Sequence, residues 1–219
     1  MKFLNYIHYF LYLSSNWNLR IALHILINDI KGEKKYGIHT TGIDDLKKTG
    51  QDISTASIYM PVSYDLLEDI FTHLPLSPRE HFLDIGCGRG RAMCVAAENN
   101  YKKISGIDFS KKLCKEALAN ASIMMQKKDS PSFDVHVANA ATYSIPSDVD
   151  CIFMFNPFND IIMKNVIENI LTSIQKRKRD VYIVYVNPLH KDLFIQKAFT
   201  EIYYSKRLKY LEVSILKIA

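Results

Sequence analysis

The residues with the clearest chemical meaning lie in the turn FLDIGCGRGR, residues 82–91. This turn holds Gly86, Gly88 and Gly90, although the whole chain has only eight glycines. Glycine lets the backbone turn sharply and approach a ligand without a clash from Cβ. Because the turn follows an apolar run and precedes a helical pattern, it is typical of a site for a nucleotide-type ligand.

The spacing and charge of this turn favour S-adenosylmethionine over a dinucleotide. A dinucleotide turn needs a small residue where this chain has Arg91. Asp84 would repel a pyrophosphate, whereas its carboxylate suits a ligand that carries an ammonium or a sulfonium group. S-adenosylmethionine carries both, together with a carboxylate that the N-terminus of a helix can hold.

Polar residues at the ends of two further expected strands suit other parts of the same ligand. Asp108 ends the run KISGID, where its two oxygens can accept hydrogen bonds from both hydroxyls of a ribose. After the next strand, the Asn139 side chain could bond an adenine amino group, and the Ala140 amide could donate to a ring nitrogen. Three successive strand ends therefore offer groups for the methionine, ribose and adenine parts.

The fourth strand ends in FNPF, which places Asn156 and Pro157 beside the expected position of the methyl group. Methyl transfer needs mainly alignment and desolvation, and it needs a base only if the nucleophile arrives protonated. His39 and His190 are the candidate bases, although a lone histidine is more often structural. An Asn-Pro pair also suits a simple turn at a strand end, so a functional and a structural interpretation of Asn156 both stay open.

Short apolar runs and helical patterns alternate in the part of the chain that must position these residues. The expected strands are residues 81–85, 103–108, 133–139, 151–156 and 181–187, and the expected helices are residues 89–99, 111–127, 161–176 and 189–198. This alternation predicts a parallel sheet covered on both faces. Two final runs, 201–208 and 210–218, are joined too briefly for a helix and predict an antiparallel pair at the sheet edge.

The first part of the chain has a different pattern. Aromatic and aliphatic residues at helical spacing predict one or two helices over residues 2–30, which either pack on the domain or contact a membrane surface or a partner. Residues 32–57 predict a long loop, of the kind that often serves as a lid or a binding loop. Residues 62–74 predict a helix. We therefore divide the chain into a helical extension, 1–54, and a second domain, 55–219.

Length and composition disfavour several classes of protein. A chain of 219 residues with 48% hydrophobic residues and a net charge of +5 suits a globular domain without a nucleic-acid partner. The four cysteines, Cys87, Cys94, Cys114 and Cys151, form no C-x-x-C pair, so we expect buried thiols and no metal site. The N-terminal apolar run lacks a signal-peptide cleavage site and is too short to span a bilayer, so we expect a cytoplasmic protein.

Taken together, FLDIGCGRGR, GIDFS, VANAAT and CIFMFNPF resemble the motifs of the class I S-adenosylmethionine-dependent methyltransferase family, over about residues 55–219. Upstream, YGIHTTG and the Tyr59-x-Pro61 pair resemble a bacterial-type subgroup with a helical N-terminal extension. Asn139 stands where the family usually has aspartate, and FNPF lacks the second proline of the motif with which amino-directed members hold a planar amino group.

The resemblance implies an α/β, Rossmann-like, doubly wound and mostly parallel seven-stranded sheet with an antiparallel edge hairpin, and S-adenosylmethionine as the cofactor. It implies the following cofactor-binding residues: Tyr59, Asp84, Gly86, Cys87, Gly88, Gly90, Asp108, Phe109, Asn139 and Ala140. It implies the following catalytic residues: Asn156, Pro157 and Phe158.

The leading hypothesis is a methyltransferase that acts on a nitrogen or oxygen of an acceptor that the sequence does not identify. A protein lysine would suit a channel built by YGIHTTG, a lipid or sugar intermediate would suit an N-terminal helix at a membrane, and a small metabolite is also open. The alternatives are a protein of the same fold that binds the cofactor without turnover and a nicotinamide-dependent oxidoreductase. Arg91 and Asp84 disfavour the oxidoreductase. The oligomeric state is left open.

Overall fold

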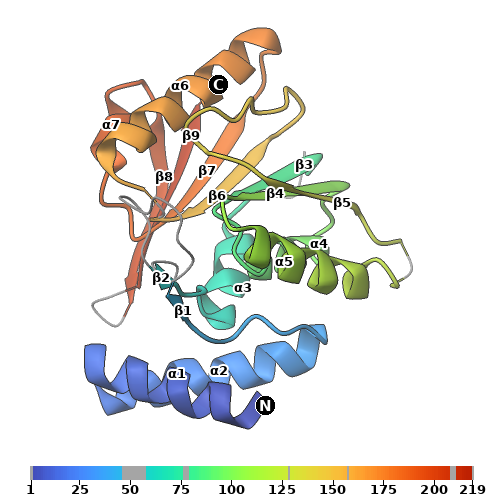
Figure 1. Ribbon diagram of the computed structural model, residues 1–219. Coiled ribbons are helices and arrows are strands. Elements are labelled where there is room, and N and C mark those ends of the chain that lie inside the picture. Colours follow the sequence, from blue (N-terminus) through green and yellow to red (C-terminus); the bar gives the residue numbers. More distant parts are fainter. Residues whose placement is uncertain are drawn as a thin grey trace.

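The structure is a computed structural model that describes residues 2–45, 58–75, 79–127, 129–156, 158–207 and 211–218. A seven-stranded sheet of order β5-β4-β3-β6-β7-β9-β8 forms its centre (Figure 1). The strands are β3 (His81–Ile85), β4 (Lys103–Asp108), β5 (Ser132–Val137), β6 (Cys151–Phe155), β7 (Val181–Val186), β8 (Thr200–Arg207) and β9 (Leu211–Ile218). The first five run parallel to one another, and β9 pairs antiparallel with both β7 and β8. The predicted fold class and edge hairpin are confirmed.

Helices cover both faces of the sheet, and each face has its own apolar core. On one face, α3 (Tyr64–Thr72), α4 (Arg91–Ala97) and α5 (Lys111–Met124) contribute buried residues such as Leu67, Met93 and Ala117. On the other face, α6 (Asp160–Lys176) and α7 (Lys191–Ile195) contribute residues such as Ile167 and Phe194. Figure 1 shows α6 above the sheet and α4 and α5 below it. The strand order reverses between β3 and β6, so a crevice is expected outside their carboxyl ends.

The N-terminal extension is a pair of helices, α1 (Lys2–Asn16) and α2 (Leu19–Tyr36), which we call the N-terminal hairpin. Asn18 caps α2 by accepting a hydrogen bond from the Ile21 amide. Tyr9, Leu13 and Ile25 belong to a small core of its own between the two helices. In Figure 1 the hairpin lies below the sheet, on the side opposite α6. None of the described helices is long and apolar enough to cross a lipid bilayer.

The expected loop over residues 32–57 is wrong at its beginning, because α2 continues to Tyr36. Gly32 does not break the helix, because it makes room for a neighbour: a Cβ at this position would lie 2.1 Å from the Tyr64 ring. The helix ends instead at Gly37, in the left-handed conformation with φ 75°. After it, β1 (Asp44–Asp45) pairs with β2 (Ile58–Tyr59). The expected domain boundary at residue 54 lies outside the described residues.

Two further expectations need correction. The parallel sheet is not covered on both faces throughout, because β5 lies at the sheet edge and has residues with exposed or half-buried side chains along its whole length. The helix expected over residues 189–198 is shorter, Lys191–Ile195, because Asn187 adopts a left-handed φ of 48° and the chain turns before it can coil. All four cysteines are free and buried, as expected.

Candidate active site

The glycine turn between β3 and α4 is held against the tip of β4. Gly86, Gly88 and Gly90 have φ of 82°, 53° and 79°, in the left-handed region that favours glycine. The amides of Gly86 and Cys87 both donate to the carbonyl of Ile107, at 2.8 and 2.9 Å. The Cys87 side chain packs into the core against Gly106, so only its backbone is at the turn surface. The turn is therefore a fixed cradle of main-chain atoms.

Asp108 at the end of β4 shapes this cradle. One carboxylate oxygen accepts the Gly88 amide at 2.9 Å, and the other accepts the Ser110 amide at 2.8 Å. Burial raises the pKa of Asp108, and these two amides partly offset the rise. A carboxylate oxygen has a second acceptor position, so the side chain that orders the turn can also accept hydroxyl groups of a ligand.

Asp84 has a different environment. Its side chain is only 3% exposed, and within the described part of the chain it accepts no hydrogen bond. Burial, and then the negative charge of Asp108, raise its pKa well above the usual value. Burying a carboxyl group without a partner costs free energy unless a cation or a hydrogen-bond donor pairs with it. An ammonium group of a ligand would do so, which suits the amino end of S-adenosylmethionine.

Tyr59 lies on the glycine turn, where the resemblance implied a residue near the methionine end of the cofactor. A Cβ at Gly88 would lie 2.2 Å from the Tyr59 ring, so this position must be glycine for packing as well as for φ. The Tyr59 hydroxyl donates to the Thr40 carbonyl at 2.8 Å, and the Arg89 guanidinium lies 5.1 Å from the ring centre. The ring is therefore anchored over the turn from two sides.

The loop after β5 carries the residues expected to contact adenine. The Asn139 amide oxygen accepts the Ala141 amide at 2.9 Å, so this loop already uses one acceptor position of the side chain. Asn169 of α6 donates to the carbonyls of Ala140 and Ala141, at 3.4 and 3.1 Å, which fixes the loop. Phe109, at the tip of β4, is half-buried. The side chain of Asn139 is exposed, so a ligand can reach the expected adenine position from the side of Asn139 as well as from the side of Phe109.

Asn156 ends β6 in a left-handed conformation, with φ 33°. Its side-chain oxygen accepts a hydrogen bond from the Tyr185 hydroxyl at 3.3 Å, and the Tyr185 oxygen accepts the His190 amide at 3.4 Å. Burial raises the pKa of Tyr185 to about 12, so its hydroxyl stays a donor at neutral pH. Phe158 is half-buried against the core on the α6 side, and Pro157 lies outside the described residues.

Comparison with known proteins identifies the family. A family model described as a methyltransferase domain matches residues 76–213. The chain belongs to this methyltransferase domain family. It is an S-adenosylmethionine-dependent methyltransferase, with S-adenosylmethionine as its cofactor. No curated protein matches the sequence.

Solved methyltransferase structures share the fold at low sequence identity. Magnesium protoporphyrin IX methyltransferase from Synechocystis PCC 6803, solved with bound cofactor, is 15% identical with a TM-score of 0.54, and the match covers 71% of this chain and 79% of that one. For an S-adenosylmethionine-dependent methyltransferase from Aquifex aeolicus the values are 14%, 0.53, 70% and 89%. For ribosomal protein L11 methylase from Lactobacillus delbrueckii subsp. bulgaricus they are 11%, 0.53, 69% and 76%. These likenesses establish the fold and leave the acceptor open.

A small apolar cavity of about 30 Å³ adjoins the strand ends of the methyltransferase. Phe155 and Asn187, at the tips of β6 and β7, contribute to its wall. The other lining residues are Tyr9, Trp17, Ile21, Ile25, Met60, Pro61, Ser63 and Leu211. The Ser63 hydroxyl is buried and has no hydrogen-bond partner among the described residues. The N-terminal hairpin thus forms an apolar wall near the tip of β6, where Asn156 follows Phe155, and the cavity has one polar group available.

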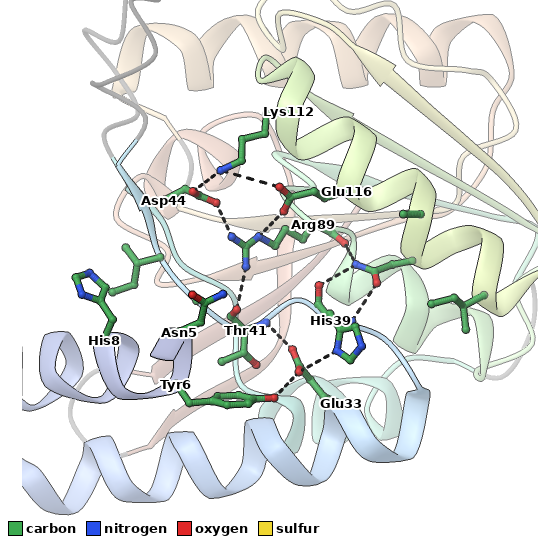
Figure 2. Close-up of a pocket in the computed structure, with 15 residues that line it drawn as sticks. Asn5, Tyr6, His8, Glu33, His39, Thr41, Asp44, Arg89, Lys112 and Glu116 are labelled. Atoms are coloured by element: carbon green, nitrogen blue, oxygen red, sulfur yellow. Dashed lines mark hydrogen bonds and ion pairs between the residues drawn. The ribbon is translucent and has the colours of Figure 1, made fainter. Parts of the chain in front are cut away.

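A larger cavity of about 640 Å³ lies between α1, residues 39–44 and α5 (Figure 2). Figure 2 shows Arg89 between two carboxylates: it pairs with Asp44 at 2.6 Å and with Glu116 at 2.8 Å, while Lys112 pairs with Asp44 at 2.7 Å. The cations of this cavity are therefore already neutralised. His39 also lines this cavity. None of the described residues that line the cavity lies at the ends of β6 or β7, where Asn156 and Asn187 are, so the structure gives no support to His39 as a base.

Arg91 has a role that the sequence analysis missed. Its guanidinium is buried and pairs with buried Asp29 of α2, at 2.6 Å, and its Nε donates to the Thr40 hydroxyl at 2.7 Å. It also lies 4.2 Å from the centre of the Tyr64 ring. The first residue of α4 therefore ties the glycine turn of the methyltransferase to the N-terminal hairpin. The available signal was Asp29 itself, a charged residue in line with apolar Ile21 and Ile25 on α2.

Proposed function

We propose that this methyltransferase transfers the methyl group to a nitrogen or oxygen atom of an acceptor that has an apolar portion. The observation that carries the proposal is the apolar cavity under the N-terminal hairpin, whose wall includes Phe155, the residue before Asn156, while Tyr185 holds the Asn156 side chain at the same strand tip. Bound S-adenosylmethionine supplies an already activated methyl group, so the protein has to align the acceptor and exclude water.

The residues around the acceptor end support these two tasks. The Asn156 side chain has one oxygen position used by Tyr185 and one further acceptor position, which suits a hydroxyl or amino group of the acceptor. Tyr9, Ile25 and Phe155 line the cavity with apolar surface, which suits an apolar group of the acceptor better than a charged lysine side chain. The cavity volume of about 30 Å³ admits only a small group, so the rest of the acceptor must lie outside it. If the nucleophile arrives protonated, His190 is the candidate base, since its backbone amide bonds Tyr185, the residue that holds Asn156.

A methyl-transfer assay tests the proposal. Wild-type protein, cell extract and radiolabelled S-adenosylmethionine are incubated, and label is measured separately in protein, lipid and small-molecule fractions. We expect label in the lipid or apolar small-molecule fraction. Asn156→Ala should lower turnover by roughly tenfold or more and leave cofactor affinity within about twofold, because it misaligns only the acceptor.

Tyr185→Phe should also lower turnover, but by a smaller factor, because Asn156 keeps its side chain and loses only the hydrogen bond from Tyr185. Tyr182→Phe is the matched control, since it removes a hydroxyl from the same strand at a position that lies beside Lys217. Label confined to protein would refute the apolar acceptor. Equal losses of cofactor affinity and turnover in Asn156→Ala would assign this residue to the cofactor instead.

A further inference from the structure

The outer face of the N-terminal hairpin exposes a concentration of large aliphatic side chains. Six of them are between 41% and 66% exposed: Ile7, Leu11, Leu19, Leu23, Ile27 and Ile30. Single exposed aliphatic residues are common on protein surfaces, but six within two short helices form a patch that needs an explanation.

The helical spacing shows that this patch is separate from the core of the hairpin. Leu19, Leu23, Ile27 and Ile30 recur at intervals of four, four and three residues, which places them along one face of α2. The buried residues of α2, including Ile21, Ile25 and Asp29, lie on a different face and contact α1 and the domain. The protein therefore folds without using the outer face.

The exposed charges of α2 itself have a single sign. The exposed charged residues of α2 are all basic: Arg20, Lys31, Lys34 and Lys35. The two acidic residues of α2, Asp29 and Glu33, are buried, one against Arg91 and the other against the amides of Thr40 and Thr41. Lys35 pairs with Glu68 of α3, whereas Arg20, Lys31 and Lys34 form no ion pair with any described residue.

We propose that the outer face of the N-terminal hairpin binds the surface of an anionic lipid bilayer. Apolar side chains on one face of a helix, with Lys and Arg as the only exposed charges, are the features of a helix that lies in the headgroup region. Each basic residue near an anionic surface adds attraction, which falls with added salt. A second copy of the chain suits the patch less well, because it would bring the unpaired cations of two hairpins together.

Sedimentation with vesicles tests this inference without any measurement of methyl transfer. The full-length protein is mixed with phosphatidylcholine vesicles that contain either no phosphatidylglycerol or about one-third phosphatidylglycerol. We expect binding to the anionic vesicles, weaker binding to the neutral ones, and release of part of the bound protein at high salt. Leu23→Glu with Ile27→Glu should weaken binding to the anionic vesicles by roughly tenfold or more, because it places charge in the apolar patch.

Ile161→Glu with Leu189→Glu is the matched control, because these residues are aliphatics outside the hairpin that are even more exposed than Leu23 and Ile27, and it should bind as the wild type does. Circular dichroism and thermal melting establish that each variant is folded. Absence of wild-type binding to anionic vesicles, or unchanged binding by the Leu23 and Ile27 variant, overturns the inference. A dimer in analytical ultracentrifugation that this variant abolishes, without vesicle binding, assigns the face to a second copy.

Discussion

At the scale of single residues, the site contains two carboxylates that differ in how the protein satisfies them. Asp108 receives two backbone amides, whereas Asp84 receives no hydrogen bond from any described residue. The cost of burying Asp84 is therefore present in the ligand-free protein and is removed only when a cationic group binds. We therefore expect Asp84 to serve ligand binding at the expense of stability.

We expect Asp84→Asn to stabilise the ligand-free protein and to weaken cofactor binding. The pKa of Asp84 is raised on folding, so its contribution to stability is fully present below the unfolded pKa and is lost as the pH rises through the folded pKa. At pH 7 folding must either bury the charged carboxylate or protonate it, and both cost free energy, so removing the carboxylate should gain about 1–3 kcal/mol. Urea unfolding measures the gain, and calorimetry with S-adenosylhomocysteine measures the loss of affinity.

Asp108→Asn is the comparison variant at the neighbouring strand tip. It should not gain stability, because one of its two amide donors would then face an amide NH₂ group instead of a carboxylate oxygen. A stability of Asp84→Asn equal to or below that of the wild type at pH 7 would show that another group already satisfies this carboxylate.

Some site residues could be predicted from the sequence because their signal is local. The glycines, Asp84 and Asp108 sit directly at the ends of apolar runs, and the structure places them together. A second Asn-Pro pair, Asn187-Pro188, follows the fifth strand, and there the sequence favours a simple turn, whereas both interpretations of Asn156 stay open. Asn187 is structural, since its side chain accepts the Glu212 amide at 3.2 Å, whereas among the described residues it is Tyr185 that bonds the Asn156 side chain. Their difference depends on strand neighbours that are distant in sequence.

At the scale of elements, the pair formed by Arg91 and Asp29 joins α4 to α2. Its two partners are 62 residues apart, and both are buried. Thr40, Thr41 and the Val62 carbonyl complete the hydrogen bonds of the guanidinium. No local pattern encodes a contact over such a separation, so the sequence predicted two helices here but not how they attach to the domain.

Asp29→Asn should destabilise the protein by about 3–5 kcal/mol, because it leaves the buried Arg91 charge without a counter-ion. The double variant Asp29→Leu with Arg91→Met should recover most of this loss, since no buried charge remains. Urea unfolding provides the measurement. Glu80→Gln breaks the exposed pair with Lys102 and should change stability by less than about 1 kcal/mol. Equal effects of Asp29→Asn and Glu80→Gln would show that the buried pair does not hold the hairpin.

At the scale of the whole molecule, three parts of the sheet meet at buried His81. Its Nδ1 lies 2.8 Å from the Asp148 carboxylate before β6, and its Nε2 lies 2.7 Å from the Ser105 hydroxyl of β4. This Ser-His-Asp arrangement is structural, because Ser105 is only 2% exposed and no substrate could reach it. Burial lowers the pKa of His81, although Asp148 acts in the opposite direction.

The protein should therefore lose stability as the pH falls below the ordinary histidine pKa of about 6.5. Because the folded pKa is depressed, this contribution is present above the unfolded pKa and is lost as the pH falls toward and through the folded pKa. Melting temperatures at pH 7.5 and pH 5.5, about one unit either side of this value, measure the effect. In His81→Gln, which cannot take up a proton, the fall between these two conditions should be smaller. An identical fall in both proteins would assign the effect to other groups.

The overall architecture was predictable because strand and helix patterns repeat over many residues and each repeat adds independent information. The sequence did not show how the helices pack against the sheet and against one another. Gly32 suggested a break in a helix, and only the Tyr64 ring packed on it explains why the helix continues there. In the same way, the spacing of residues 2–30 predicted helices but did not show which helix face packs against the domain. The face that stays exposed is the one that can bind a partner or a surface.

The short segment of residues 37–43 lies between the hairpin and the cofactor turn and belongs to both. Glu33 accepts the amides of Thr40 and Thr41, Arg89 donates to the Thr41 carbonyl, and Asn120 bonds the His39 backbone. A fragment trimmed to the residues that match the family model would keep every family motif and lose all of these bonds. The smallest piece able to assemble the candidate site therefore begins well before residue 76, where the match to the family model begins.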